Sequence, residues 1–234
     1  MKLSLPTPPL AKELTRQPQN SAVFNIIDSG QIEFSQALSL QKNILQQIIF
    51  RQAPDTLIFC QHPAVITLGR LAKNENLLVS PDFLKQQGIG LFSAERGGDI
   101  TCHEPGQLVV YPLINLAGYR KDLKWYLNNL EEVVIDFLRY FGIKGIRRPG
   151  LTGVWVREGK IASIGIAVKH WVSYHGIAVN INNRLEIFSL VRPCGLDAQM
   201  VSLQGLCKNK IDFAEAKRIM QNSFENVFKR GYSQ

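Results

Sequence analysis

Residues 153 to 168, GVWVREGKIASIGIAV, limit the possible folds of this chain more than any other stretch. Two runs of apolar and β-branched residues flank the short polar segment EGK, which is typical of a β-hairpin. Residues 176 to 182, GIAVNIN, predict a further strand. The chain therefore needs a sheet with hairpin-linked strands, and helices must cover the faces of that sheet.

Helical periodicity is clear in three places: residues 35–50, residues 123–142, and a segment that begins at Asp212, where Glu215 forms an expected capping pair. The expected buried stripes are Leu38, Leu40, Ile44, Leu45, Ile48 and Ile49; Leu123, Leu127, Leu130, Val134, Phe137 and Phe141; and Ile219, Met220, Phe224, Val227 and Phe228. Gly142 is the expected end of the second helix. Residues 22–28 and 55–62 indicate strands, with Cys60 in the core. We predict an α+β fold, with a mixed, largely antiparallel sheet flanked by helices.

The composition fits a folded protein: 45% of the 234 residues are hydrophobic and 20% are charged. No apolar run reaches the roughly 18 residues that cross a bilayer. Prolines interrupt the start of the chain, where a signal peptide needs a continuous apolar core. We expect residues 1–21 to form a flexible tail, residues 22–234 to form one domain, and the protein to be cytoplasmic and not bound to a membrane.

Cysteine spacing and net charge narrow the function classes. Cys60, Cys102, Cys194 and Cys207 form no C-x-x-C pair, which argues against a structural zinc site and, at this size, against a disulfide scaffold. The net charge of +8 favours an acidic partner. Basic residues are not interleaved with aromatic ones, which argues against a nucleic-acid stacking surface.

The segment ERGGDITCHEPGQLVVYP, residues 95–112, is the densest in candidate binding groups. Its glycines let a ligand approach the main chain, Arg96 suits a carboxylate or phosphate, and His103 suits a carbonyl oxygen. It matches neither a phosphate-binding loop nor a dinucleotide-binding motif. A tight loop around a core histidine explains the segment equally well.

Small residues alternate with bulky ones on two expected strands. Ser163 and Gly165 share one face, and so do Gly176 and Ala178. Such a shallow face has room for an extended apolar chain. Close packing of a helix on the sheet is the simpler explanation when these residues are taken alone.

Cys194 lies in the segment VRPCGLD, between a proline that stiffens the chain and a glycine that leaves it open. A free thiol is only a few per cent ionised at neutral pH, and a nearby ammonium lowers its pKa by about 1–3 units. Lys160 would supply that ammonium if the two residues meet. Its position at the hairpin turn is otherwise typical of a solvated lysine.

Four of these segments occur together in one known family. RGGDITCHEPGQLVVYP, GVWVREGKIASIGIAV, YHGIAVNI and RPCGL, preceded by HPAVITLGR, resemble in order and spacing the octanoyltransferases of lipoate biosynthesis. The resemblance spans roughly residues 22–205. It implies the fold of the biotin and lipoate protein ligases.

The resemblance also implies a reaction and its residues. An octanoyl group would pass from acyl carrier protein to a lysine of a lipoyl domain, in a 2-oxoacid dehydrogenase or the glycine cleavage H protein, with no cofactor and no metal. Cys194 matches the acyl-carrying nucleophile, and Lys160 matches the lysine that lowers the pKa of that thiol. The implied substrate-binding residues are Arg96, Gly97, Gly98, Asp99, Ile100, Thr101, Cys102, His103, Ser163, Ile164, Gly165, Gly176, Ile177 and Ala178.

The chain departs from the family at Cys102 and Glu104, where an aromatic residue and a glycine are usual. If residue 104 needs a positive φ, glutamate costs on the order of 1–2 kcal/mol there. Its carboxylate would also oppose a nearby thiolate.

Three alternatives stay open at this point. They are an ATP-dependent lipoate protein ligase on the same fold, a non-catalytic basic binding protein, and a metal enzyme. The metal enzyme would gather His62, His103, His175 and Cys102, and no ligand spacing supports it.

Overall fold

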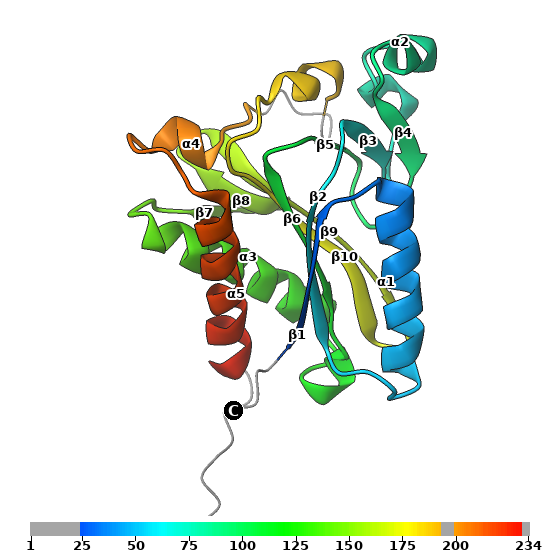
Figure 1. Cartoon of the computed structure of the whole chain (residues 1–234), viewed down its shortest axis with the longest axis vertical. Helices are drawn as coiled ribbons and strands as arrows, with labels where there is room; N and C mark the ends of the chain where they lie inside the picture. Colours follow the sequence, from blue (N-terminus) through cyan, green and yellow to red (C-terminus); the bar gives the residue numbers. More distant parts are fainter. Residues whose placement is uncertain (1–23, 193–198, 231–234) are drawn as a thin grey trace, which may run out of the picture.

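The main sheet confirms the predicted architecture. The computed structural model describes residues 24–192 and 199–230, so the expected tail and Cys194 lie outside the described residues. Within these ranges one sheet has the order β1-β2-β6-β10-β9-β8-β7 (Figure 1). Its strands are β1 (Asn25–Gln31), β2 (Thr56–Gln61), β6 (Gln107–Leu113), β7 (Ile146–Arg148), β8 (Leu151–Val156), β9 (Gly159–Lys169) and β10 (Val172–Asn180). Only β1 and β2 pair in parallel among these neighbours, so the sheet is mixed and largely antiparallel.

Helices cover both faces of this sheet. α3 (Leu123–Tyr140) and α5 (Phe213–Arg230) lie together on one face, and α1 (Phe34–Ile49) lies on the other (Figure 1). The stripe predicted for α5 is fully buried, because its residues recur at helical spacing and meet α3 and the sheet. Cys60 is buried as predicted. The prediction that Leu123 is buried is wrong, because Leu123 is the first residue of α3 and is exposed.

The predicted ends of two helices are confirmed in part. Gly142 follows the end of α3 with a φ of +70°, a left-handed conformation that glycine adopts without strain. Asp212 accepts a hydrogen bond from the N–H of Ala214 at the start of α5. The carboxylate of Glu215, the expected capping partner, accepts a hydrogen bond from the Tyr140 hydroxyl and so connects α5 to α3.

The hairpin of β8 and β9 is confirmed, but its turn is shorter than expected. Arg157 has a φ of +51°, so Arg157 and Glu158 alone connect the strands. Gly159 and Lys160 therefore belong to β9, and the expectation of a solvated lysine at the turn is wrong. Lys160 is 7% exposed.

A second, smaller sheet was not predicted. It has the order β4-β3-β5, formed by β3 (Val65–Leu68), β4 (Gly90–Ser93) and β5 (Ile100–His103), and α2 (Pro81–Gln86) packs beside it (Figure 1). The remaining elements are the 3-10 helices η1 (Asn74–Asn76), η2 (Leu116–Gly118) and η3 (Glu186–Leu190), and the short helix α4 (Leu203–Leu206). None of the helices in the described ranges combines the length and the apolar character that a membrane span requires.

Candidate active site

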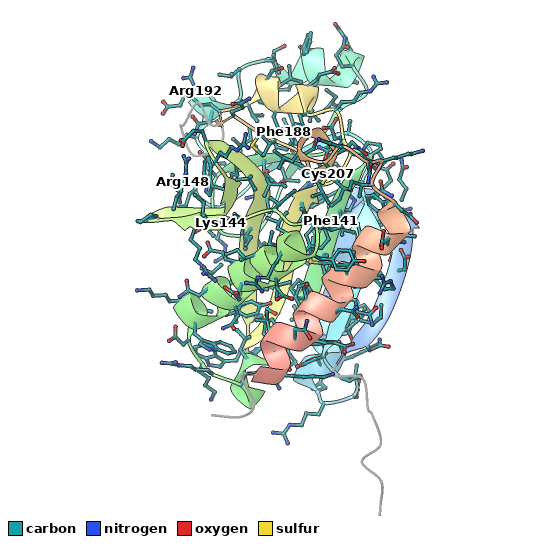
Figure 2. The ribbon with its side chains drawn as sticks, turned by 90° about the vertical axis from the view of Figure 1, so that its left-hand side faces the viewer. Phe141, Lys144, Arg148, Phe188, Arg192 and Cys207 are labelled. Carbon is teal, nitrogen blue, oxygen red and sulfur yellow. The ribbon has the colours of Figure 1, made fainter. Side chains whose placement is uncertain are left out.

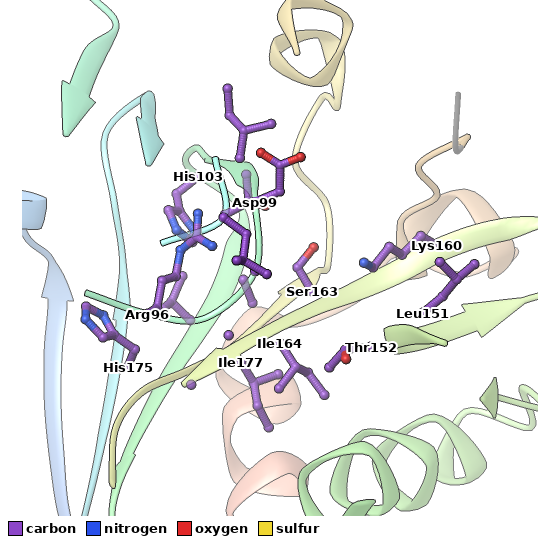
Figure 3. A pocket seen from close by; sticks show the side chains of 18 of the residues that line it. Arg96, Asp99, His103, Leu151, Thr152, Lys160, Ser163, Ile164, His175 and Ile177 are labelled. Carbon is purple, nitrogen blue, oxygen red and sulfur yellow. The ribbon is translucent and has the colours of Figure 1, made fainter. Parts of the chain in front are cut away.

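A cavity of 410 Å³ lies between β9 and β10 on one side and the segment from Arg96 to His103 on the other (Figure 3). The register of β9 and β10 places Ser163 opposite Ala178 and Gly165 opposite Gly176. All four of these small residues line the cavity. The functional interpretation of the small-residue faces is therefore supported, because their lack of bulk leaves room beside the sheet.

The two glycines also permit close packing, but their nearest neighbours belong to a loop and to strand β6 and not to the helix of the simpler explanation. A Cβ at Gly165 would stand 3.0 Å from the carbonyl oxygen of Gly97, so the loop could not come as close. A Cβ at Gly176 would stand 2.4 Å from the Val110 carbonyl oxygen. Both residues thus serve the packing of the main chain as well as the cavity.

Arg96 ties the loop over the cavity to the small sheet. Its guanidinium donates to the Thr67 carbonyl at 2.6 Å and to the Thr67 hydroxyl at 2.9 Å, and the side chain is buried. Gly69 makes room for this arrangement, since a Cβ there would stand 2.7 Å from Nη1 of Arg96. The N–H of Gly97 donates to the Ile166 carbonyl at 2.8 Å and fixes the loop over β9. Arg96 lines the cavity while these bonds hold its guanidinium in place.

His103 faces the cavity as a hydrogen-bond acceptor. Nε2 of Gln107 donates to the Cys102 carbonyl and to Oδ1 of Asn180, which leaves Oε1 of Gln107 to accept from Nδ1 of His103 at 2.7 Å. Burial lowers the pKa of His103 to about 3, so the ring is neutral at pH 7. A neutral ring protonated at Nδ1 has a lone pair at Nε2. His103 therefore does not suit the role of donor to a carbonyl oxygen that its position in the sequence indicated.

Two more histidines lie near His103. The ring centroids of His62 and His103 are 5.5 Å apart, but both ring nitrogens of His62 are hydrogen-bonded, to the Ile32 carbonyl and the Tyr111 hydroxyl at 2.7 Å each. The described residues contain no cluster of three histidine, cysteine or acidic side chains that could hold a metal ion. Both ring nitrogens of His62 are thus used in hydrogen bonds within the fold.

His175 lines the cavity, although the sequence indicated it only as a ligand in the metal-enzyme alternative. It has a φ of +57° within β10, and its N–H donates to Oε1 of Gln41 at 2.8 Å. Its Nε2 is buried and has no hydrogen-bond partner among the described residues. Burial, and next the positive charge of Arg96, lower the pKa of His175 to about 4.

Lys160 lies at the other side of the cavity from His103 and His175 (Figure 3). Its ammonium nitrogen is 5.6 Å from the ring centroid of Trp155, whose ring also packs against the Arg148 guanidinium at 4.4 Å. A Cβ at Gly153 would stand 2.7 Å from Cε of Lys160. An aromatic face and a bare glycine thus define the space that this buried amine occupies.

The main chain of Lys160 pairs with the residues that follow the segment 193–198. Its N–H donates to the Gln199 carbonyl at 2.8 Å, and its carbonyl accepts from the Val201 N–H at 3.0 Å. Lys160 and Met200 form a parallel bridge. The chain on the other side of the segment is also held, because the Arg192 N–H donates to the Asn76 carbonyl at 2.8 Å. Cys194 itself lies outside the described residues.

Of the effects expected at Cys102 and Glu104, the backbone strain does not arise. Cys102 is fully buried and does not line the cavity, and burial, followed by the charge of Glu104, raises the pKa of its thiol well above the usual range. Glu104 is absent from the described residues with positive φ, so the backbone strain expected there does not arise. Its carboxylate accepts hydrogen bonds from Asn183 and Leu185 and does not line the cavity.

Two arginines near the hairpin, Arg147 and Arg148, form ion pairs with acidic side chains. Arg147 contacts the carboxylates of Glu131 and Glu132, and Arg148 contacts Glu158 at 2.6 Å. Figure 2 shows Arg148 and Arg192 on the same side of the molecule.

The cavity brings together most of the predicted residues. Besides Lys160 it is lined by Arg96, Gly98, Asp99, Ile100, Thr101, His103, Ser163, Ile164, Gly165, Gly176, Ile177 and Ala178, but not by Gly97 or Cys102. Sequence reasoning missed Phe34, Leu71, Val109, Tyr111, Gly150, Leu151, Thr152, Trp155 and His175. Two of these could have been found from the sequence, because Trp155 lies on the hairpin strand beside Lys160 and His175 directly precedes the small-residue face.

Comparisons with known proteins identify the family and agree with the fold. A family model described as the lipoyl protein ligase A/B catalytic domain matches residues 33–225. An octanoyltransferase of Caldicellulosiruptor bescii is 43% identical over 208 residues, which cover 88% of this chain and 91% of that protein. A lipoate-protein ligase A bound with ATP has a TM-score of 0.73 at 16% identity, covering 88% of this chain and 85% of that one. The biotin protein ligase of Aquifex aeolicus has a TM-score of 0.56 at 14% identity, covering 88% of this chain and 71% of that one.

Proposed function

Because this chain belongs to the octanoyltransferases of the lipoyl protein ligase A/B catalytic-domain family, we propose that it transfers octanoyl groups through a thioester on Cys194. The donor is octanoyl-acyl carrier protein, and the acceptor is a lysine of a lipoyl domain. Membership in this family makes the protein an acyltransferase of lipoate biosynthesis and removes the alternative of a non-catalytic basic protein.

The observation that carries the proposal is the position of Lys160. This lysine is buried in the cavity wall, and its main chain pairs with Gln199 and Val201. Gln199 follows Cys194 by only five positions in the sequence, an extended length of at most about 18 Å. The arrangement supports a meeting of the thiol and the amine at the cavity, although the two are 34 positions apart in the sequence.

The first half of the reaction forms the acyl-enzyme. Lys160, as a neutral amine, takes the proton of the Cys194 thiol, and the thiolate attacks the carbonyl carbon of the carrier thioester. A new C–S bond forms, the carrier C–S bond breaks, and the Lys160 ammonium returns its proton to the carrier sulfur. One thioester replaces another, so the step is nearly balanced and needs no ATP.

The second half transfers the octanoyl group to the acceptor. The lysine amine of the lipoyl domain attacks the Cys194 thioester, and Lys160 takes a proton from that amine. An amide forms and the Cys194 thiolate leaves. The ammonium of Lys160 then stabilises the thiolate, as a cation within about 4–6 Å does by 1–3 pKa units.

The cavity suits the octanoyl chain. Its wall includes Ile100, Ile164 and Ile177, and the small residues of β9 and β10 leave its floor open. The segments that the family uses for substrate thus border one space that reaches Lys160. The net charge of +8 favours encounter with an acidic carrier.

The shared fold keeps an ATP-dependent ligase as the rival reaction. The two are separated by incubating the protein with octanoyl-carrier and an apo lipoyl domain in the absence of ATP. We expect octanoylation of the domain, and intact-protein mass of the enzyme mixed with octanoyl-carrier alone should show one added octanoyl group.

Two variants make this experiment specific. Cys194→Ala should abolish both the adduct and the transfer, and Cys207→Ala, at a half-buried cysteine outside the cavity, should change neither. Transfer that requires ATP, or an adduct that persists in Cys194→Ala, would overturn the proposed mechanism.

A further inference from the structure

Glu104 connects the loop after β5 to the segment after β10. Its side chain is buried, and its Oε1 accepts hydrogen bonds from the Leu185 N–H at 2.8 Å and from Nδ2 of Asn183 at 3.0 Å. A carboxylate oxygen that receives two donors forms a strong, directional anchor. The residue that departs from the family pattern therefore has a definite structural partner.

The first donor lies at the start of the segment that leads to Cys194. Leu185 has a φ of +71°, an uncommon conformation for a residue with a Cβ, and η3 begins immediately after it. The chain then reaches Arg192, whose N–H is held by the Asn76 carbonyl. The hydrogen bond from Leu185 to Glu104 thus fixes the point from which residues 186–192 start.

The second donor, Asn183, is connected to the main chain of Lys160 through a series of hydrogen bonds. Nδ2 of Asn183 also donates to Oδ1 of Asn180 at 3.2 Å, and Nδ2 of Asn180 donates to the Val201 carbonyl at 3.1 Å. Val201 in turn pairs with Lys160 through its N–H. One carboxylate therefore connects to the chain on both sides of residues 193–198.

Cys102, the other residue that departs from the family pattern, contacts the same segment. Sγ of Cys102 lies 3.6 Å from the carbonyl oxygen of Ile187 in η3, within reach of a weak S–H hydrogen bond. A thiol is small enough to pack beneath η3 at this point. Cys102 and Glu104 thus both contact residues 185–187, on the approach to Cys194.

We propose that Glu104 is a positioning residue for the acyl transfer. It acts on no reacting atom, and it holds the segment that begins at Leu185 in register with the strand that carries Lys160. The inference rests on the proposed function. It assigns a role in the reaction to a carboxylate that the family pattern does not contain.

The test compares three variants. Glu104→Ala removes the acceptor, Glu104→Gln keeps an acceptor oxygen without the charge, and Glu186→Gln removes an exposed charge from the same segment as a control. We expect Glu104→Ala to lower kcat at least tenfold while the KM for octanoyl-carrier changes less than twofold, since the cavity wall is intact. Glu104→Gln should stay within threefold of wild-type kcat, and Glu186→Gln should equal wild type.

A second readout follows the thiol directly. The pH dependence of Cys194 alkylation by iodoacetamide, measured by peptide mass, should shift in Glu104→Ala toward the midpoint of a free thiol, about 8.5. Loss of folding stability alone would not move this midpoint in protein that circular dichroism shows to be folded. Wild-type kcat together with an unchanged midpoint in folded Glu104→Ala would overturn the inference.

Two further outcomes are informative. If Glu104→Ala does not fold, Asn183→Ala tests the path to Lys160 with the same readouts, and unchanged kcat there overturns the inference. Failure of the wild-type protein to acquire an octanoyl group on Cys194 would instead count against the proposed function. The two failures are thus distinguished by the wild-type measurement.

Discussion

The side chain of Lys160 lies against the bare backbone of Gly153, on the neighbouring strand of the hairpin. A Cβ at residue 153 would stand 2.7 Å from Cε and 3.2 Å from the ammonium nitrogen of Lys160. Gly153 has a φ of +127°, which residues with a Cβ rarely adopt. The position of this buried amine therefore depends on a glycine that carries no reactive group itself.

We expect Gly153→Ala to lower kcat/KM for octanoyl transfer at least tenfold, because the new methyl group displaces Lys160 from the cavity wall. It should also destabilise the fold by about 1–3 kcal/mol through overpacking and backbone strain. Gly142→Ala is the matched control, since Gly142 also has a positive φ but a Cβ there would meet no neighbouring atom within 4 Å. The control should lose stability by about 1 kcal/mol and keep wild-type kcat/KM. Urea unfolding and steady-state kinetics of both variants check the prediction, and equal activity of the two would contradict it.

Trp155 supplies the aromatic face beside Lys160. A cation over an aromatic ring gains about 0.5–2 kcal/mol, depending on how far it is desolvated. We expect Trp155→Leu to lower kcat/KM roughly threefold to thirtyfold and to change its pH profile, because the ammonium form of Lys160 loses this stabilisation. Trp155→Phe keeps an aromatic face and should retain more activity at every pH. Identical pH profiles for the two variants would show that the ring only fills space.

The helices and the hairpin could be predicted because their signals are local. In α5 the residues from Ile219 to Phe228 repeat at helical spacing, and the same face packs on α3. The small sheet could not be predicted in this way, since each of its strands has only four residues. Contacts between distant residues hold it in place, such as that of Arg96 with Thr67.

In the candidate site, too, the features with a local sequence signal could be predicted, and those that depend on distant contacts could not. The face shared by Ser163 and Gly165 follows from strand alternation and could be seen in the sequence. The burial of Lys160 could not, because it depends on the left-handed Arg157 that shortens the turn and on pairing with Val201. The resemblance to a family drew attention to Lys160, and this lysine is buried in the cavity wall where the local pattern favoured a solvated one.

Buried histidines make the folded state sensitive to acid. The pKa of His175 is about 4 when folded, mainly because burial disfavours its charged form, against about 6.5 when unfolded. Between these values the unfolded chain binds more protons, so stability is full above about pH 6.5 and falls as the pH drops, at up to about 1.4 kcal/mol per pH unit. His103, with a pKa of about 3, contributes in the same direction.

We therefore expect His175→Asn to reduce the loss of stability between pH 7 and pH 5. Asparagine tolerates the left-handed backbone at this position and does not titrate. Urea unfolding at the two pH values measures the difference for wild type and variant. An equal loss of stability in both proteins would mean that His175 does not contribute to the acid sensitivity.

Ser163 lines the cavity between Lys160 and the histidines, where the proposed function places the acyl chain. Its side chain points into the cavity in Figure 3, and its cross-strand partner is Ala178. Leucine at this position adds bulk where an extended chain would lie, and overpacking of a bound chain costs about 1–3 kcal/mol, or roughly fivefold to 160-fold in kcat/KM. We expect Ser163→Leu to lower kcat/KM at least tenfold for octanoyl-carrier but less than threefold for butanoyl-carrier, because a shorter chain does not reach the added side chain.

Ser163→Ala keeps the space and should keep the wild-type preference for chain length. Competition between carriers of two chain lengths, analysed by mass spectrometry of the lipoyl domain, measures the preference directly, and a loss of equal size for both lengths would place the acyl chain elsewhere.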